Sequence, residues 1–197
     1  MRSCAVIIAG GRSSRMGREK AFESVHGQII LDRIVARLGT QTDMIAINTN
    51  GDTGRFAQWG LPVIVDMRSN IGTPLAGLHA ALSHAANNDF DAVLTAPSDT
   101  PFLPEDLMNR LRAASSSAAI ARSGGQAHFL TGLWSVTLLP ALEQALQQPR
   151  PPRLQDWCSM CHAALVEWPI TPFDPFFNVN TPEDLAEAER IAASFEP

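Results

Sequence analysis

The chain has 197 residues, 45% of them hydrophobic, and a formal net charge of −5. This length fits one large domain with a substantial core, and the acidic balance argues against a general nucleic-acid-binding surface. No apolar run approaches the length of a membrane span, and the N-terminal run is too short for a signal sequence. We therefore expect a cytoplasmic protein without a membrane partner.

Short apolar runs alternate along the chain with segments of helical periodicity. The strands expected from these runs cover residues 4–8, 44–47, 62–65, 92–96, 117–121, 129–136 and 163–168. Three expected helices cover residues 30–38, 75–86 and 140–146. Another expected helix is entered through Pro104, which we expect in its first turn. The last expected helix begins at Thr181, where a capping residue, a proline and two acidic residues follow one another. This alternation predicts an α/β fold with a mainly parallel sheet flanked by helices. The rhythm breaks after Pro101, which indicates an insertion or a second lobe built on the same sheet.

Three cysteines make a disulfide framework improbable. Cys158, Cys161 and His162 match the C-x-x-C-H pattern of haem attachment, but neither an export signal nor a second ligand pair accompanies it. We interpret Trp157, Cys158 and Cys161 as the buried side of a helix that precedes a strand.

A glycine-rich segment follows the first strand and contains Gly10, Gly11 and Arg15 before it reaches Lys20. Lys20 is the only lysine among fifteen cationic side chains. Lysine is a compact point charge, whereas arginine is a wide planar fork, so a tight phosphate loop favours lysine. The spacing matches neither the Walker loop nor the dinucleotide fingerprint. We interpret the segment as a loop whose backbone amides face phosphate oxygens and whose cations lie nearby. The alternative is a loop that is merely solvated.

Polar residues stand where the first four strands end. Gly10, Asn48, Asp66 and Asp99 each follow one of these strands, and carboxyl ends of parallel strands line one crevice. We therefore expect the four residues to converge, although each could also be an ordinary turn residue. Prolines flank Asp99, and a rigid carboxylate beside a phosphate site is typical of a Mg²⁺ ligand. A turn or capping role is the alternative for Asp99.

Two further segments carry candidate binding residues. Gly77, at the start of a helix, would let a flat base approach the backbone, or would merely ease helix packing. Asn178 and Asn180 lie on one side of an extended segment and offer amide donors and acceptors, although Asn180 could instead cap the last helix.

Taken together, the motifs resemble the molybdenum cofactor guanylyltransferases, the MobA family, from end to end of the chain. The resemblance rests on Ile8-Ala9-Gly10-Gly11, Arg15-Met16-Gly17 with Lys20, Pro74-Leu75-Ala76-Gly77, Asp99-Thr100-Pro101 and Asn178-Val179-Asn180-Thr181-Pro182-Glu183. It implies a Rossmann-like nucleotidyltransferase fold in a single domain, 1–197, with a nucleotide-binding half of about 1–100 and an acceptor-binding half of about 101–197. It also implies transfer of GMP from GTP to molybdenum-molybdopterin, with Mg²⁺ and release of pyrophosphate.

The resemblance also assigns roles to residues of this chain. GTP-binding roles fall on Ile8, Ala9, Gly10, Gly11, Lys20, Asn48, Asp66, Gly77 and Asp99. Catalytic roles fall on Arg15, Lys20 and Asp99, metal binding on Asp99, and pterin binding on Asn178, Asn180 and, more weakly, Arg153. The Ala9-Gly10-Gly11 sequence favours GTP over the CTP of related enzymes. Thr73 and Phe129, after Gly72 and His128, depart from the usual family sequence.

The same resemblance leaves two other functions open. One is a cytidylyltransferase for the same cofactor or another NTP-dependent nucleotidyltransferase, and the other is a non-catalytic nucleotide-binding module. Transient contact with cofactor-delivering proteins or molybdoenzymes is an expected partnership.

Overall fold

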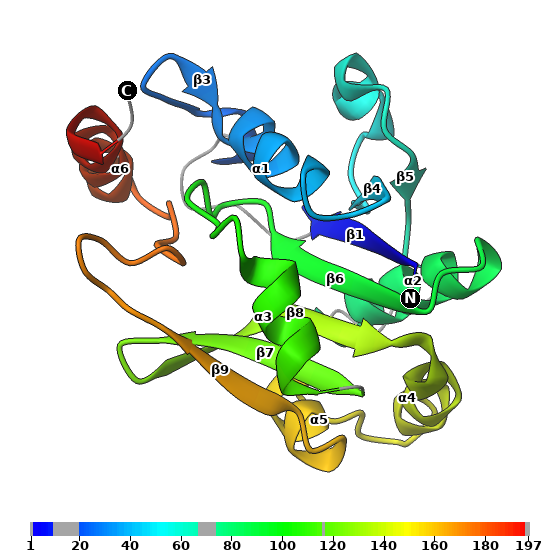
Figure 1. Cartoon of the computed structure of the whole chain (residues 1–197). Helices are drawn as coiled ribbons and strands as arrows, with labels where there is room; N and C mark the ends of the chain where they lie inside the picture. The colour runs from blue at the N-terminus through cyan, green and yellow to red at the C-terminus, as the bar shows by residue number, and fades with distance from the viewer. Residues whose placement is uncertain (1, 10–19, 67–73, 116, 196–197) are drawn as a thin grey trace.

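A computed structural model gives the fold, and it describes residues 2–9, 20–66, 74–115 and 117–195. Its centre is a seven-stranded sheet with the strand order β5-β4-β1-β6-β8-β7-β9, so β5 and β9 form the two edges (Figure 1). The strands are β1 (Ser3–Ile8), β4 (Met44–Asn48), β5 (Val63–Ile64), β6 (Ala92–Pro97), β7 (Ala118–Ser123), β8 (Gln126–Ser135) and β9 (Ala164–Trp168). All neighbours pair in parallel except β8, which runs antiparallel to β6 and β7. The expected mainly parallel sheet is thus confirmed.

Helices cover both faces of this sheet. The helices are α1 (Ile30–Gly39), α2 (Pro74–Asn87), α3 (Leu107–Ala114), α4 (Leu139–Leu146), α5 (Leu154–Met160) and α6 (Pro182–Phe195). Alternate residues of β1 divide the core: Ala5 and Ile7 pack with α1, α3 and α6, while Val6 and Ile8 pack with α2, α4 and α5. This alternation is what a central parallel strand requires, because both of its faces are buried.

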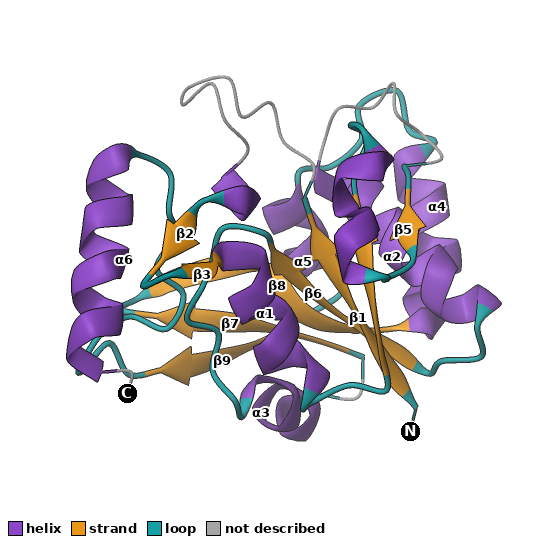
Figure 2. Ribbon diagram, turned by 90° about the horizontal axis from the view of Figure 1, so that it is seen from above, coloured by secondary structure: helices purple, strands orange, loops and turns teal. Residues whose placement is uncertain are grey.

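Short elements complete the fold. They are the hairpin of β2 (Ser24–Val25) and β3 (Gln28–Ile29) and the 3₁₀ turns η1 (Lys20–Phe22), η2 (Thr53–Trp59) and η3 (Val136–Leu138). Figure 2 shows the hairpin beside α6, and the His26 backbone N–H donates to Glu189 Oε2 of that helix at 2.8 Å. Among the described residues, no helix combines the length and apolar content needed to cross a membrane.

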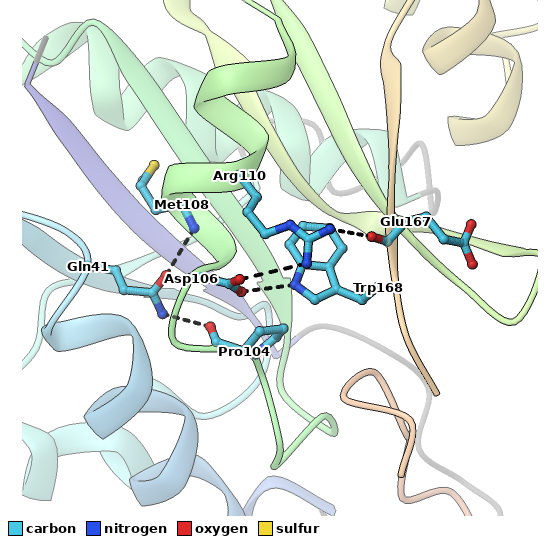
Figure 3. A network of polar contacts seen from close by, with 7 residues as sticks. All are labelled: Gln41, Pro104, Asp106, Met108, Arg110, Glu167 and Trp168. Carbon is cyan, nitrogen blue, oxygen red and sulfur yellow. Dashed lines mark hydrogen bonds and ion pairs between the residues drawn. The ribbon is translucent and has the colours of Figure 1, made fainter. Parts of the chain in front are cut away.

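The helix after Pro104 begins later than the sequence indicates, so the expected first-turn role of Pro104 is wrong. The helix starts at Leu107, and Pro104 lies in the preceding turn. The Gln41 side chain explains this start (Figure 3): its amide donates to the Pro104 carbonyl at 2.9 Å, and its Oε1 accepts from the Met108 N–H at 2.9 Å. A distant side chain thus satisfies a first-turn donor, which a local cap would otherwise do.

The connection between β7 and β8 also differs from the expected boundaries. β7 continues to Ser123, and β8 already begins at Gln126, because Gly124 and Gly125 form a two-residue turn with φ of 53° and 81°. Both positions lie in the left-handed region, which glycine enters without a steric penalty. Residues 117–121 and 129–136 therefore cover only part of a longer hairpin.

The segment with the C-x-x-C-H pattern is α5 and the turn before β9. Trp157 and Cys158 are buried against the sheet, which confirms their expected place on the inner side of a helix, while Cys161 is half-buried after the helix. Burial raises the pKa of the Cys158 thiol to about 12. The thiolate that binds metals is therefore disfavoured at this position.

Candidate nucleotide-transfer site

The carboxyl ends of three parallel strands lie side by side. The Ala9 N–H, directly after β1, donates to the Asn48 carbonyl of β4 at 2.8 Å. On the other side, the Ser98 N–H, directly after β6, donates to the Ile8 carbonyl at 3.2 Å. The strand order reverses here, because β4 and β6 flank β1 on opposite sides. Open α/β sheets bind ligands at such a reversal point.

Asn48 and Asp66 form a polar cluster at the end of β4. Asn48 is almost completely buried, and its side-chain amide donates to Asp66 Oδ1 at 2.9 Å and to the Ile64 carbonyl at 3.3 Å. Asn50, which the sequence analysis did not single out, donates to Asp66 Oδ2 at 2.6 Å and accepts from the Asp66 N–H at 2.9 Å. Both carboxylate oxygens are therefore held in a fixed orientation. The two-residue spacing from Asn48 was the signal that could have identified Asn50.

Gly77 of α2 lies against this cluster. A Cβ added to Gly77 would meet Asn48 Oδ1 at 3.0 Å and Ile8 Cγ2 at 3.3 Å. The absence of a side chain thus lets the start of α2 approach the ends of β1 and β4 closely. Ile8, Asn48, Asp66 and Gly77 form one contiguous cluster, which reaches the solvent-exposed surface mainly through the half-buried Asp66.

Replacing Gly77 with alanine tests the GTP-binding role that the sequence resemblance implies for this cluster, and it should weaken GTP binding more than it weakens the fold. Alanine gains about 1 kcal/mol of helix propensity, which offsets part of an overpacking cost of about 1–3 kcal/mol. The new methyl group would displace the Asn48 side chain, so we expect KM for GTP to rise about tenfold, the change that 1.4 kcal/mol produces. The measurement is steady-state kinetics together with thermal unfolding. Gly39→Ala is the matched control, because its nearest contact would be Ile45 Cδ1 at 3.9 Å; an equal KM change in both variants would contradict the prediction.

Asp99 lies next to this surface, in the turn after β6. It is half-buried, and its Oδ1 is closed off from solvent. The Thr100 hydroxyl fixes the turn by donating to the Pro97 carbonyl at 3.1 Å. Within the described ranges, no group of three or more His, Cys, Asp or Glu side chains is placed to hold a metal ion. One rigid carboxylate still fits Mg²⁺, which proteins commonly bind through one or two carboxylates together with substrate phosphates.

The segment that contains Asn178 and Asn180 is attached directly to Asp99. The Val179 N–H donates to the Asp99 carbonyl at 2.9 Å, and the Val179 side chain is fully buried. Asn178 and Asn180 are exposed on either side of it in the sequence, as alternation in an extended segment requires. The Thr181 hydroxyl, rather than Asn180, caps α6 by accepting from the Asp184 N–H at 3.1 Å.

Other predicted residues are not placed at this surface. Gly10, Gly11 and Arg15 lie outside the described residues, and Lys20 is described only as the first backbone position of η1. Arg153 is exposed just before α5, and its N–H donates to Asp156 Oδ2 at 3.1 Å. That helix packs on the sheet face opposite to the core that contains Val179.

The chain matches the family model of the MobA-like NTP transferase domain over residues 5–162. It is 45% identical over 195 residues to a molybdenum cofactor guanylyltransferase of Nitrobacter hamburgensis, covering 95% of this chain and 93% of that protein. A protein from Archaeoglobus fulgidus described as molybdopterin-guanine dinucleotide biosynthesis protein A has a similar structure. It superimposes with a TM-score of 0.71 at 22% identity and covers 98% of this chain and 100% of the other. A 4-diphosphocytidyl-2C-methyl-D-erythritol synthase from Anaerococcus prevotii gives a TM-score of 0.75 at 15% identity, over 98% and 96% of the two chains.

The parallel sheet, the polar cluster at its carboxyl edge and these matches define an enzyme of the nucleotidyltransferase class with a Rossmann-like fold. Within that class, the likeness to one group of enzymes extends over nearly the whole chain. The chain belongs to the molybdenum cofactor guanylyltransferase family, a branch of the MobA-like NTP transferases.

Proposed function

We propose that this protein transfers GMP from Mg²⁺-bound GTP to molybdenum-molybdopterin and releases pyrophosphate. The observation that carries the proposal is the bond between the Val179 N–H and the Asp99 carbonyl. This bond joins the edge that contains Ile8, Asn48 and Asp66 to the segment that contains Asn178 and Asn180. Donor and acceptor sites are thereby adjacent, as a direct transfer between two bound substrates requires.

The proposal divides the chain into a nucleotide-binding half, about 1–100, and an acceptor-binding half, about 101–197. In the first half, Ile8, Ala9 and the glycines that follow, with Asn48, Asp66 and Gly77, would bind GTP. In the second half, Asn178 and Asn180 would orient the pterin, and Arg153 is a weaker candidate for the same role. Asp99 lies at the junction of the two halves and belongs to both sites.

The transfer needs no covalent enzyme intermediate. A phosphate oxygen of molybdopterin forms a bond to the α-phosphorus of GTP while the bond from that phosphorus to the bridging oxygen breaks, and pyrophosphate leaves with the electron pair. The attacking phosphate is ionised at neutral pH, so a general base is dispensable. Arg15 and Lys20 would stabilise negative charge on the phosphates, and Asp99 would hold Mg²⁺. Bound Mg²⁺ supplies further positive charge to the triphosphate.

The direct test is to incubate the protein with Mg-GTP and molybdenum-molybdopterin and to analyse the product by mass spectrometry. The expected product is the guanine dinucleotide cofactor together with one pyrophosphate per transfer. GTP binding without pyrophosphate release would identify a non-catalytic nucleotide-binding module instead. Since GTP is a cytoplasmic metabolite, the proposal also locates the enzyme in the cytoplasm. Transient contacts with proteins that deliver the pterin or accept the product follow from the same role.

Base choice is a second prediction from this proposal. Guanine has two adjacent donors on its pairing edge, whereas cytosine and adenine have an acceptor there. Asp66, whose two oxygens Asn48 and Asn50 hold in place, has lone pairs left to accept from guanine. A wrong base would leave such acceptors unpaired, so kcat/KM for CTP and ATP should fall about 10²-fold or more below that for GTP. Comparable values for CTP and GTP would indicate a cytidylyltransferase.

A further inference from the structure

A polar chain of three side chains lies at the acceptor-side end of the sheet. The Ser123 hydroxyl, at the end of β7, lies 2.7 Å from His128 Nε2 of β8 and donates to Asp174 Oδ1 at 2.8 Å. Ser123 is 1% exposed, and the same carboxylate oxygen accepts from the Phe176 N–H at 2.9 Å. The two strands of the β7–β8 hairpin and the segment at Asp174, which is 51 residues away from Ser123 in the sequence, therefore meet at one buried hydroxyl.

The direction of these hydrogen bonds follows from counting protons. An ionised carboxylate only accepts, so the single Ser123 proton is used in the bond to Asp174. His128 must then donate from Nε2 to the Ser123 oxygen, which fixes the imidazole as the Nε2–H tautomer. His128 thus orients Ser123, and Ser123 orients Asp174.

The His128 ring also contacts the segment after Asp174, which the three hydrogen-bonded side chains hold in place. It stacks on Phe176 with ring centroids 4.7 Å apart and an interplanar angle of 31°, while Trp168 packs edge-on against Phe176 at 5.3 Å. Trp168 is itself fixed (Figure 3): its indole N–H donates to Asp106 Oδ1 at 2.9 Å, and the Arg110 guanidinium lies 4.2 Å from its ring centroid. Phe176 therefore lies between two immobilised rings.

The clamped segment leads directly to the proposed acceptor site. Phe176 is anchored at one end, and three residues later Val179 is anchored to the Asp99 carbonyl. Asn178, between these anchors, and Asn180, directly after the second, have little freedom to shift independently. The His128 clamp, meaning His128, Ser123 and Asp174 together, thus sets the position of the backbone that carries both asparagines.

We propose that His128 is a positioning residue for the acceptor: through Ser123 and Asp174 it fixes residues 174–180, and so controls binding of the pterin phosphate but not of GTP. This inference rests on the proposed function. It predicts a larger change in acceptor affinity than in GTP affinity, because the contacts of Asn48, Asp66 and Gly77 lie outside the clamp and Val179 is bonded only to the backbone carbonyl of Asp99.

Acid should weaken the clamp because a charged imidazole is disfavoured where His128 is buried, even though its Nε2–H still donates to Ser123. Burial lowers the pKa of His128 below its usual 6.5, and the carboxylates of Asp174 and Glu167 only partly oppose this effect. Arg122, which is paired with Glu167 at 3.2 Å, and Arg110, which donates to the Glu167 carbonyl, are cations of this group. The folded clamp therefore favours neutral imidazole, so its contribution is complete above about pH 6.5 and is lost as the pH falls through the lower pKa of the folded state. The acceptor phosphate also titrates near pH 6, so only the difference between variants isolates His128.

The test compares four variants in KM for the acceptor, KM for GTP and their pH profiles. His128→Phe keeps a ring on Phe176 but loses the donor, and Ser123→Ala interrupts the chain. Loss of one such bond should raise KM for the acceptor about 3- to 10-fold, while KM for GTP changes less than twofold. His128→Gln keeps an N–H donor without a titrating ring, so it should have a smaller effect and a flatter pH profile between pH 5 and 6.5. His84→Gln is the control, since burial also lowers the pKa of His84, in α2, and it should match the wild type.

Amide hydrogen exchange gives a readout that does not need the cofactor. Ser123→Ala should reduce protection of the Phe176 and Val179 amides in the free protein, whereas His84→Gln should not. Equal increases in both KM values, or unchanged acceptor KM with unchanged protection, would overturn the proposed positioning role. If the wild-type protein forms no guanine dinucleotide, the proposed function fails, and the exchange measurement still decides whether the clamp orders residues 174–180.

Discussion

Replacing Asp99 with asparagine should reduce kcat/KM by about 10²–10³ at low Mg²⁺ concentration while the fold persists. The magnitude is that of losing one charge-stabilising group in a transfer reaction. An amide oxygen is a weaker ligand than a carboxylate for a hard cation, so high Mg²⁺ should partly restore activity. Thr100 and Val179 fix the turn through backbone carbonyls, which the substitution leaves intact. The measurement is activity against Mg²⁺ concentration, with thermal unfolding alongside.

Asp43→Asn is a matched control for this variant. Asp43 precedes β4 at the opposite edge of the sheet, where its carboxylate accepts from the Ser3 N–H at 3.0 Å. Asparagine can make the same contact, so this variant should retain both activity and the wild-type Mg²⁺ dependence. Unchanged activity of Asp99→Asn at low Mg²⁺ would show that Asp99 is not the metal ligand.

Lys20→Ala and Lys20→Arg should both lose most activity, by about 10²–10³, and should unfold near the wild-type temperature. The lost group is a compact cation proposed to act on the triphosphate, and the wider arginine fork should not replace it. The fold should persist because the two residues after Lys20, and not Lys20 itself, attach η1 to the core. Ala21 is buried, and Phe22 packs against Phe56 and Trp59 at centroid distances of 5.4 and 5.7 Å.

Steady-state kinetics and thermal unfolding again decide the outcome. Arg190→Ala is the control for the Lys20 variants. It removes one positive charge from an exposed position on α6 and should leave kcat and KM unchanged. Full activity of Lys20→Arg would refute the argument that a compact ion is required. A fall in unfolding temperature that accounts for the lost activity would instead assign Lys20 a structural role.

The sequence predicted the sheet well because its parallel strands have a strong signal. Strands such as β1 are buried on both faces and appear as continuous apolar runs between helical segments. The full length of the β7–β8 hairpin was missed although the sequence contains its signal, because the Gly124-Gly125 pair, which takes positive φ angles, is typical of a two-residue turn. The start of α3 depends on Gln41, which is far away in the sequence. No local pattern contains that information.

The convergence of the residues proposed to bind the nucleotide was predictable for the same reason. Parallel strands end at one edge, so Asn48, Asp66 and Asp99 could be expected near one another from their positions alone. The proximity of Ser123 and His128 could not be predicted in this way. The strand β8 is antiparallel, and its register with β7 shifts between Ile120 and Ala121. Gly132 pairs with Ile120, whereas His128 pairs with Ala121. This shift brings His128 within reach of Ser123, and the sequence does not reveal it.

The return of α6 to the β2–β3 hairpin limits how such enzymes can recombine. The last helix of the proposed acceptor-binding half is bonded to the first half of the chain through Glu189 and the His26 N–H, and Val179 is bonded to Asp99. A chimera that joined two relatives near residue 100 would therefore place a foreign final helix against an unmatched hairpin. Exchange of acceptor preference by recombination would require the hairpin and α6 to be inherited together. Divergence by point substitution at the exposed Asn178 and Asn180 meets no such barrier.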